Sequence, residues 1–423
     1  MQTETGATHC PQCSQQVPVD PRCVTWCDKC DWNVDPTPTD RPYAAWRLKL
    51  EHRLADTLYR ELESGTVHRA SWDAARLTAY LLSALLLLVP LTAFLGGIAL
   101  LLFYRPLWLS IAFAVVAFCL AILFRPRMHG LSDDAQPLHR ADAPSLYAVL
   151  DRLAEAIGTQ PVHLVVVDAE PNIWFARIGW RFRPVVGIGV PAWIALGPQE
   201  RVAVLAHELG HGKHGDARHG FVVDAAETIL AEIQETFSTQ PLDDFRREAG
   251  VYLETDPTVG IVTRILNATV GALARSYGWL LAKAALRSSQ RAEYLADRKA
   301  GEMAGSEAAA SMLERTLLFS TSYLALERRL RFAPDEEPVA AVRRELGEFP
   351  AREIERRVRA SRIRDTRTDS THPPTYLRTR LIRTRPATSA RVVLGPEENH
   401  AIDRKLAGPA DAALRELQLS FPR

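Results

Sequence analysis

The five residues from His207 to His211 could form a metal site. They read His-Glu-Leu-Gly-His, and two histidines four residues apart lie on one face of a helix, where both can ligate one zinc ion. Glu208 would then lie beside the open coordination position, where it could take a proton from an attacking water. Three fixed positions also arise by chance on solvated helices. The pattern therefore predicts a candidate zinc site with Glu208 as its general base.

The flanking residues predict that this segment is a buried helix. Gly197-Pro198 supplies a break with proline at a natural first-turn position, and Glu200 places negative charge near the positive end of the helix dipole. The run 202–206 is wholly apolar, so it carries the polar pentapeptide into a core. Polar groups are costly there unless they bind something. We expect Gly212 and Gly215 to end the helix.

The third metal ligand must come from elsewhere in the chain. A metzincin would have glycine at position 214 and histidine at 217, whereas this chain has His214 and Ala217. The segment 289–301 has helical composition and places Glu293 and Asp297 four residues apart on one face. One carboxylate could ligate zinc while the other hydrogen-bonds a ligand imidazole. The same acid pair in an arginine-rich helix could instead form solvated salt bridges.

Three motifs follow one another in order along the chain. They are His207 to His211 with Asp216, then 293–297, then Thr-His-Pro-Pro at 371–374 with Arg378. Together they resemble the three signatures of the HtpX-like membrane zinc metallopeptidases, gluzincins that include the CAAX prenyl endopeptidases. The resemblance covers roughly residues 140 to 385. It implies a zinc peptidase whose metal ligands are His207, His211 and Glu293, with Glu208 as general base.

The resemblance also implies roles for residues around the metal. Asp216, Asp297 and Arg378 would contact the metal ligands without binding the metal themselves. His372 would lie near the cleft and take part in catalysis. A histidine before two prolines is equally a plain loop residue on spacing alone.

The β-branched run 185–190 predicts a strand near this site. If it were an edge strand, an extended substrate could pair with it through backbone hydrogen bonds. Such pairing would explain broad sequence tolerance. A core strand is the commoner interpretation of a run of this kind.

Two uncharged apolar runs predict a transmembrane helical hairpin. They occupy 77–104 and 107–124, which are 28 and 18 residues, and only Arg105-Pro106 separates them. As helices they would reach ~42 Å and ~27 Å, against a hydrocarbon core of ~30 Å. By contrast, Arg264, Arg275 and Lys283 interrupt the segment 259–286, which we therefore predict to be amphipathic.

Positive charge predicts which side of the membrane the flanks occupy. The turn has only Arg105, while both flanks are richer in arginine, with Arg60, Arg69 and Arg76 before the hairpin and Arg125, Arg127 and Arg140 after it. The positive-inside rule then leaves both flanks in the cytoplasm. We expect a multi-pass cell-membrane protein whose N-terminal segment and peptidase domain face the cytoplasm.

Cysteine spacing predicts a second zinc site near the N-terminus. Five of six cysteines fall within residues 10–30, and two C-x-x-C pairs are separated by 13 residues. This spacing suits a structural zinc held by Cys10, Cys13, Cys27 and Cys30. Disulfides are the alternative, which the cytoplasmic side disfavours.

Two details of this segment depart from the simplest zinc ribbon. Ser14 and Asp31 stand where glycine often follows each pair, and Cys23 could compete with Cys27 as a ligand.

We therefore expect a mainly helical α+β protein with a small sheet and a zincin-type peptidase domain. The expected parts are a zinc ribbon (1–34), a proline-rich linker (35–42), an amphipathic helix region (43–76), the hairpin (77–124), the peptidase domain (125–390) and a partly helical C-terminal tail (391–423). A net charge of +1 and the lack of dense basic and aromatic clusters argue against nucleic acid as a partner.

The expected function is zinc-dependent hydrolysis of peptide bonds in membrane or misfolded proteins, with one catalytic and one structural zinc. One alternative is a processing peptidase dedicated to a prenylated or otherwise lipidated substrate. Another is a non-catalytic, membrane-tethered scaffold, against which Glu208 argues because a scaffold needs no base beside a metal. The sequence does not indicate what the ribbon binds.

Overall fold

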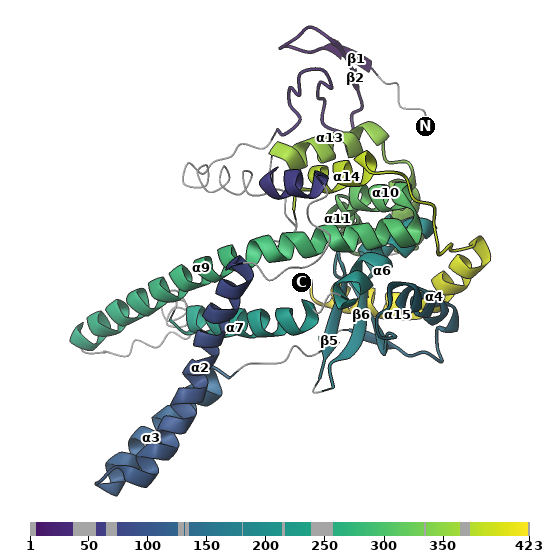
Figure 1. Ribbon diagram of the computed structural model, residues 1–423. Helices are drawn as coiled ribbons and strands as arrows, with labels where there is room; N and C mark the ends of the chain where they lie inside the picture. The colour runs from purple at the N-terminus through teal and green to yellow at the C-terminus, as the bar shows by residue number, and fades with distance from the viewer. Residues whose placement is uncertain are drawn as a thin grey trace. The chain divides into compact units, whose positions relative to one another are not determined.

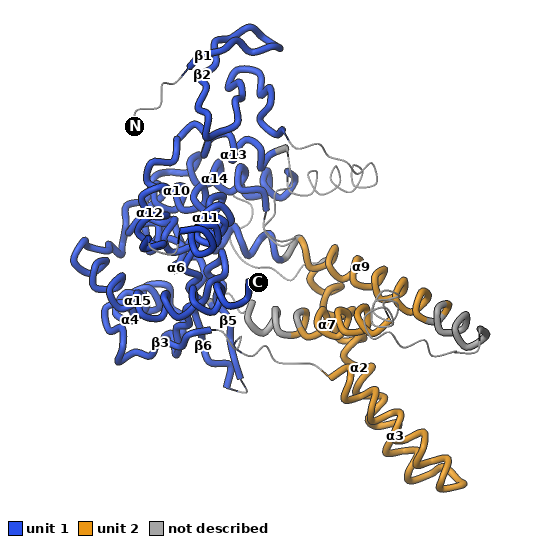
Figure 2. The backbone as a smooth tube through the Cα atoms, turned by 180° about the vertical axis from the view of Figure 1, so that it is seen from behind, with its two compact units in different colours: residues 1–70, 130–216, 289–423 blue, residues 71–129, 217–288 orange. Residues whose placement is uncertain are grey.

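A computed structural model describes most of the chain as two compact units. The described residues are 6–36, 56–64, 74–125, 131, 135–179, 181–213, 216–237, 257–333, 336–363 and 373–421. Unit 1 comprises 1–70, 130–216 and 289–423, and unit 2 comprises 71–129 and 217–288 (Figure 2). Most of the expected linker and the first part of the expected helix after it lie outside the described residues, although 56–63 is helical.

Unit 1 contains a four-stranded mixed sheet. Its order is β3 (Gln136–Leu138), β4 (Leu164–Asp168), β6 (Arg183–Gly189) and β5 (Ile173–Ile178), with only β4 and β6 parallel. The run 185–190 thus supplies a central strand, so the edge-strand alternative for it is wrong. Val185, Val186 and Ile188 are all buried, because both faces of this strand are covered. The two edge strands of the sheet are β3 and β5.

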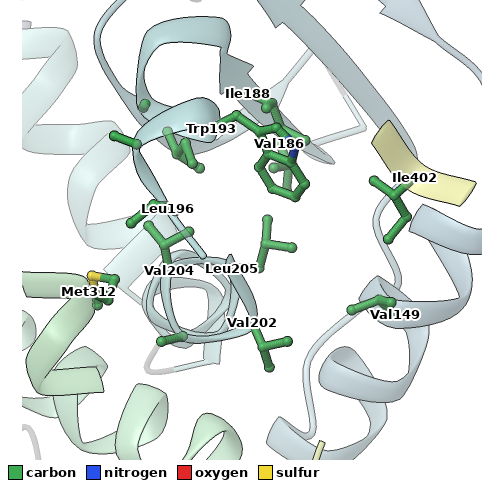
Figure 3. Packing of buried hydrophobic residues seen from close by; sticks show 14 of the residues in the cluster. Val149, Val186, Ile188, Trp193, Leu196, Val202, Val204, Leu205, Met312 and Ile402 are labelled. Atoms are coloured by element: carbon green, nitrogen blue, oxygen red, sulfur yellow. The ribbon is translucent and has the colours of Figure 1, made fainter. Parts of the chain in front are cut away.

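The core of unit 1 surrounds helix α6 (Pro198–Lys213). Val202 and Leu205 of this helix are fully buried among residues from α4 (Pro144–Ile157), the sheet and α5 (Val190–Ala195), as Figure 3 shows around Val186 and Trp193. The predicted buried helix is confirmed, and Pro198 is its first residue. It ends at Lys213, so Gly212 lies inside it.

Further helices complete unit 1 (Figure 1). They are the end of α9 (Pro257–Ala304), α10 (Ser306–Thr316), α11 (Phe319–Phe332), α12 (Pro338–Gly347), α13 (Ala351–Ile363), α14 (Thr375–Thr384) and α15 (Pro396–Leu419). The segments 259–286 and 289–301, considered separately in the sequence, both lie in one continuous helix, α9. Ile402 and Leu406 of α15 belong to the main core, so much of the expected C-terminal tail packs with the peptidase region. The expected fold class, mostly helical with a small mixed sheet, is confirmed.

Unit 2 contains the two apolar helices that the sequence predicts. They are α2 (Ala74–Phe103) and α3 (Leu107–Leu123). The span 76–103 is long and apolar enough to cross a membrane, whereas α3 is a shorter apolar helix. A Cβ on Gly97 would meet the Phe118 ring at 2.7 Å, so this glycine lets the two helices approach closely. The N-terminal part of α2 packs with α7 (Asp216–Thr236) and with α9 around Ile229 and Leu281.

The N-terminal segment of unit 1 is a two-stranded hairpin with a cysteine cluster. Strands β1 (Gly6–His9) and β2 (Gln16–Val19) are antiparallel. Ser14 and Asp31 have φ of 59° and 57°, so they adopt the left-handed conformation that glycine usually supplies after such cysteine pairs. Their presence there therefore does not prevent the turns of a zinc ribbon.

Candidate active site

Three ligand atoms converge between α6 and α9. Nε2 of His207 lies 3.2 Å from Nε2 of His211, and these nitrogens lie 3.4 and 3.3 Å from the two carboxylate oxygens of Glu293. Ligands of a tetrahedral zinc with bonds of ~2.0–2.1 Å are separated by about 3.3 Å. The donor set and its spacing therefore fit zinc. His207 and Glu293 are almost wholly buried, and the His211 side chain is 23% exposed.

Two small residues allow the elements around this cluster to approach each other. A Cβ on Gly210 would lie 3.3 Å from the Cα of Ala296, so α6 and α9 pack closely beside the histidines. A Cβ on Gly212 would lie 3.1 Å from the Phe175 ring, which brings the end of α6 against β5. The helix ends at Lys213, between the two glycines expected to end it, and Gly215 lies outside the described residues.

Arg378 and Asp297 form a buried clamp behind the cluster. The Arg378 guanidinium donates to both carboxylate oxygens of Asp297 at 2.8 and 2.6 Å, and lies 3.2 Å from Glu293. Asp297 also lies 3.1 Å from Nδ1 of His207. This is the contact expected of a carboxylate that orients a ligand imidazole through its second nitrogen.

The charges in this cluster favour an ionised metal-binding carboxylate. Burial would raise the pKa of Glu293, but the charge of Arg378 and the contacts with His211 and His207 hold it well below its usual value. The pKa of Asp297 is likewise lowered, because its interactions with Arg378 outweigh burial. Burial lowers the pKa of His207, but its contacts with Asp297 and Glu293 outweigh that effect and raise it to about 9.

A cleft of about 340 Å³ opens onto the cluster. His207, Glu208 and His211 form part of its lining, so the expected general base faces the same space as two metal ligands. Edge strand β5 contributes Ile173, Trp174 and Phe175 to another wall. The remaining lining includes Met312, Leu313, Thr316, Phe319, Pro373, Thr375 and Arg378.

Not every expected site residue is described. His372 lies outside the described residues, so its role stays a prediction. Asp216 is the first residue of α7, and its role also stays a prediction. The structure brings together Glu208, the three expected ligands and the Asp297–Arg378 pair.

The β5 and α10–α11 walls of the cleft were not expected from the sequence. The aromatic run Ile-Trp-Phe at 173–175 has the composition of a strand, but composition does not show that this strand lies at the edge of the sheet. Thr316 and Phe319 carry no signal, since only tertiary packing brings them to the metal site.

The second candidate metal site is the cysteine cluster. Sγ of Cys10 lies 3.6 Å from that of Cys30, and Sγ of Cys13 lies 3.6 Å from that of Cys27. Sulfur atoms around a tetrahedral zinc with bonds of ~2.3 Å are about 3.8 Å apart. The four expected residues form this group, and the alternative ligand Cys23 is not part of it.

Comparisons with known proteins agree with the site. Peptidase family M48 matches residues 141–386, more than half of the 423-residue chain. "Protease HtpX homolog" of Syntrophobacter fumaroxidans is 34% identical over 110 residues, covering 24% of this chain and 39% of that protein. "Protease HtpX homolog 1" of Saccharolobus solfataricus is 36% identical over 91 residues, covering 21% and 28%. The chain thus spans less than half the length of these curated relatives, and no solved structure matches it significantly.

Proposed function

Because the chain belongs to peptidase family M48, we propose that it is a zinc-dependent endopeptidase. The observation that carries the proposal is the convergence of His207, His211 and Glu293 in a cleft that Glu208 also lines. A non-catalytic scaffold protein would need neither a buried three-ligand metal site nor an acidic side chain beside it. The ligand geometry and the position of Glu208 in the cleft lining therefore favour catalysis over a structural role for this site.

The proposed chemistry divides between the metal and the protein. A bound zinc supplies Lewis acidity and lowers the pKa of a coordinated water to ~7. Glu208 accepts the proton of the attacking water and delivers it to the departing amine. Asp297 holds the His207 ring through Nδ1, and Arg378 keeps Asp297 and Glu293 ionised and fixed. These side chains are thereby oriented before substrate binds.

Strand β5 is the proposed docking edge for substrate. It pairs with β6 on one side and lies at the end of the sheet order, and its residues 173–175 line the cleft. An extended peptide could add to this edge through backbone hydrogen bonds, which depend little on side-chain identity. Such pairing would let the cleft accept many substrate sequences, as a peptidase that acts on membrane or misfolded proteins in quality control requires.

The proposed location is the cell membrane, with unit 2 as the anchor. Large apolar side chains of α2 and α3 stay exposed within that unit, among them Leu85 (58%) and Trp108 (69%). Exposed apolar surface of this extent is costly in water and favourable in lipid. The arginine-rich flanks support a cytoplasmic peptidase domain and ribbon. The expected domain boundaries and a structural zinc at the four cysteines belong to the same proposal.

One experiment tests the catalytic proposal. The protein is purified in detergent, its zinc content per chain is measured, and casein cleavage is compared for wild type, Glu208→Gln and Glu155→Gln. We expect two zinc ions in all three proteins, because Glu208 is a base and not a ligand. Cleavage should fall by about 10²–10⁴-fold in Glu208→Gln, and stay unchanged in Glu155→Gln, which alters an exposed acid on α4.

Two outcomes would count against this proposal. If a single zinc is found and Cys10→Ser with Cys13→Ser removes it, no catalytic metal remains and the enzyme proposal fails. If casein is not cut but a prenylated peptide is, the protein is a dedicated processing peptidase instead.

A further inference from the structure

The N-terminal cysteine segment packs on helix α13 of the same unit through one buried tryptophan. Trp26 is 1% exposed and packs with Val34 against Ala360 of α13. Two guanidinium groups lie near its ring, with Cζ of Arg352 and Arg359 at 4.6 and 5.1 Å from the ring centroid. This contact is specific, because the tryptophan is buried against α13 and lies within cation–π distance of two of its arginines.

Arginines of α13 also bind the backbone of the hairpin segment. Arg352 donates to the Trp26 carbonyl at 2.8 Å, and Arg356 donates to the Val34 carbonyl at 2.7 Å. Arg359 donates to the Asp28 carbonyl at 2.6 Å and to the Asp31 carboxylate at 2.9 Å. Three arginines on one helix face thus hold the segment around Cys27 and Cys30 (Figure 1 shows it beside α13).

Other residues of α13 contact the wall of the catalytic cleft. Arg357 donates to the Leu317 carbonyl at 2.9 Å and to the Thr321 hydroxyl at 2.7 Å, which fixes the turn between α10 and α11. Thr316 and Phe319 of this region line the cleft. Glu353, which is buried, binds both Arg356 and Arg357 at 2.6 and 3.0 Å, and so joins the two contact surfaces of α13.

A second connection runs from α13 to α14. The Tyr376 backbone N–H donates to the Ser361 hydroxyl at 3.1 Å, and the Arg362 guanidinium lies over the Tyr376 ring at 5.5 Å. Two residues further along α14 is Arg378, which binds Asp297 and Glu293 at the metal site. Helix α13 therefore contacts two cleft walls on one side and the hairpin on the other.

The hairpin segment depends on its own metal to present Trp26. Its internal apolar cluster consists of Cys10, Val17 and Cys27, with Cys13, Cys30 and Trp32 partly buried against it. So small a cluster does not fold a segment of this length without a metal or a disulfide. Asp28 lies between the metal ligands Cys27 and Cys30 in the sequence, and its backbone carbonyl accepts a hydrogen bond from Arg359.

We propose that Trp26, Arg352, Arg356 and Arg359 are positioning residues through which the metal-loaded ribbon braces the catalytic cleft. The inference rests on the proposed peptidase function. Loss of the four-cysteine metal, or of this interface, frees α13 and loosens the α10–α11 turn and α14. Hydrolysis then declines although the His207, His211 and Glu293 site keeps its metal.

The test uses two measurements: hydrogen exchange reports the rigidity of the cleft walls, and peptide hydrolysis reports activity. Trp26→Ala changes the ribbon side, and the double variant Arg352→Ala with Arg359→Ala changes only α13, so that a misfolded ribbon in the first does not decide the result. Arg22→Ala is the matched control, because this ribbon arginine pairs with Asp20. Hydrogen exchange is measured on zinc-loaded full-length protein in a Glu208→Gln background, and peptide hydrolysis in the Glu208 background.

We expect faster exchange over 313–321 and 373–384 in both interface variants, with exchange in α6 and β4 unchanged. We expect kcat to fall by about 10–100-fold, since small displacements of positioning groups have effects of this size, with one zinc retained at the histidine site. Arg22→Ala should match wild type in both measurements.

Three results would overturn the proposal or separate it from the proposed function. Unchanged exchange in both interface variants rejects the brace. Lost activity without a change in exchange means that the ribbon recruits substrate instead, which also rejects it. If wild type has no peptidase activity, the proposed function fails, while faster exchange in the variants still supports a metal-dependent brace.

Discussion

The two metal clusters of this protein are built in opposite ways. The His207, His211 and Glu293 cluster joins two helices that are distant in sequence, inside a large core that also covers the sheet. The four-cysteine cluster is formed within 21 consecutive residues, from Cys10 to Cys30, around a core that contains one valine. The first site is positioned by packing, whereas the second has little packing without its metal.

This difference assigns a different task to each metal. In the core site, Gly210 and the Arg378–Asp297 clamp set the ligand positions through contacts that do not involve a metal. A metal there contributes chemistry. In the ribbon, ligation replaces the missing apolar burial, so binding energy is folding energy. Removing each metal should therefore damage different properties of the protein.

The largest expected effect is the loss of catalysis on removal of one core ligand. Glu293→Gln removes the anionic ligand, so we expect casein cleavage to fall to background and zinc content to fall from two ions to one. The core should stay folded, because its packing does not depend on the metal. Zinc analysis and far-ultraviolet circular dichroism measure both properties, with Glu155→Gln as the control. Global unfolding of Glu293→Gln would contradict the comparison, since the site would then not be set by packing.

The next largest effect concerns the clamp. Arg378→Leu leaves the buried carboxylates of Asp297 and Glu293 without their guanidinium, and breaking such a buried pair costs about 3–5 kcal/mol. The matched control is Arg383→Ala on the same helix, whose ion pair with Glu314 is half exposed and is worth about 0–1 kcal/mol. Denaturant unfolding measures both. Equal losses in the two variants would show that the clamp contributes nothing special to the site.

A smaller, local effect is expected in the ribbon. Cys13→Ala removes one of four thiolate ligands, so zinc content should fall by one ion and residues 6–36 should become sensitive to protease. The main unfolding transition of unit 1 should stay within a few degrees of wild type, because its core shares no residue with the ribbon cluster. Limited proteolysis and calorimetry test this. A ribbon that stays protease-resistant without zinc would show that docking on α13 alone holds it.

The sequence predicted the chemistry of both sites better than their surroundings. His207, Glu208 and His211 share one helical repeat, and the cysteine pairs share one local segment, so short-range spacing was enough to find them. Glu293 required the family resemblance, because the packing of α6 against α9 through Gly210 has no local signal. The sequence left open whether 185–190 is an edge strand or a core strand, because a β-branched run does not show how many neighbours a strand has. Trp26 and its arginines were not recognised as partners, because more than 300 residues separate them in sequence.

The smallest expected effect tests whether the ribbon site is as selective as its geometry. The sequence left Cys23 as a possible competitor of Cys27, but the structure groups Cys27 with the other three ligands and leaves Cys23 out. Burial, with the nearby charge of Glu353, raises the pKa of the Cys23 thiol, so it stays protonated at neutral pH and is a poor metal ligand. Cys23→Ser should therefore keep two zinc ions and the same zinc release rate under chelator, while Cys27→Ser should lose one ion. Faster zinc release from Cys23→Ser would mean that Cys23 takes part in metal binding and that the ribbon exchanges ligands. The ribbon metal would then not be held by one fixed set of four cysteines, and the contrast with the core site would be weaker.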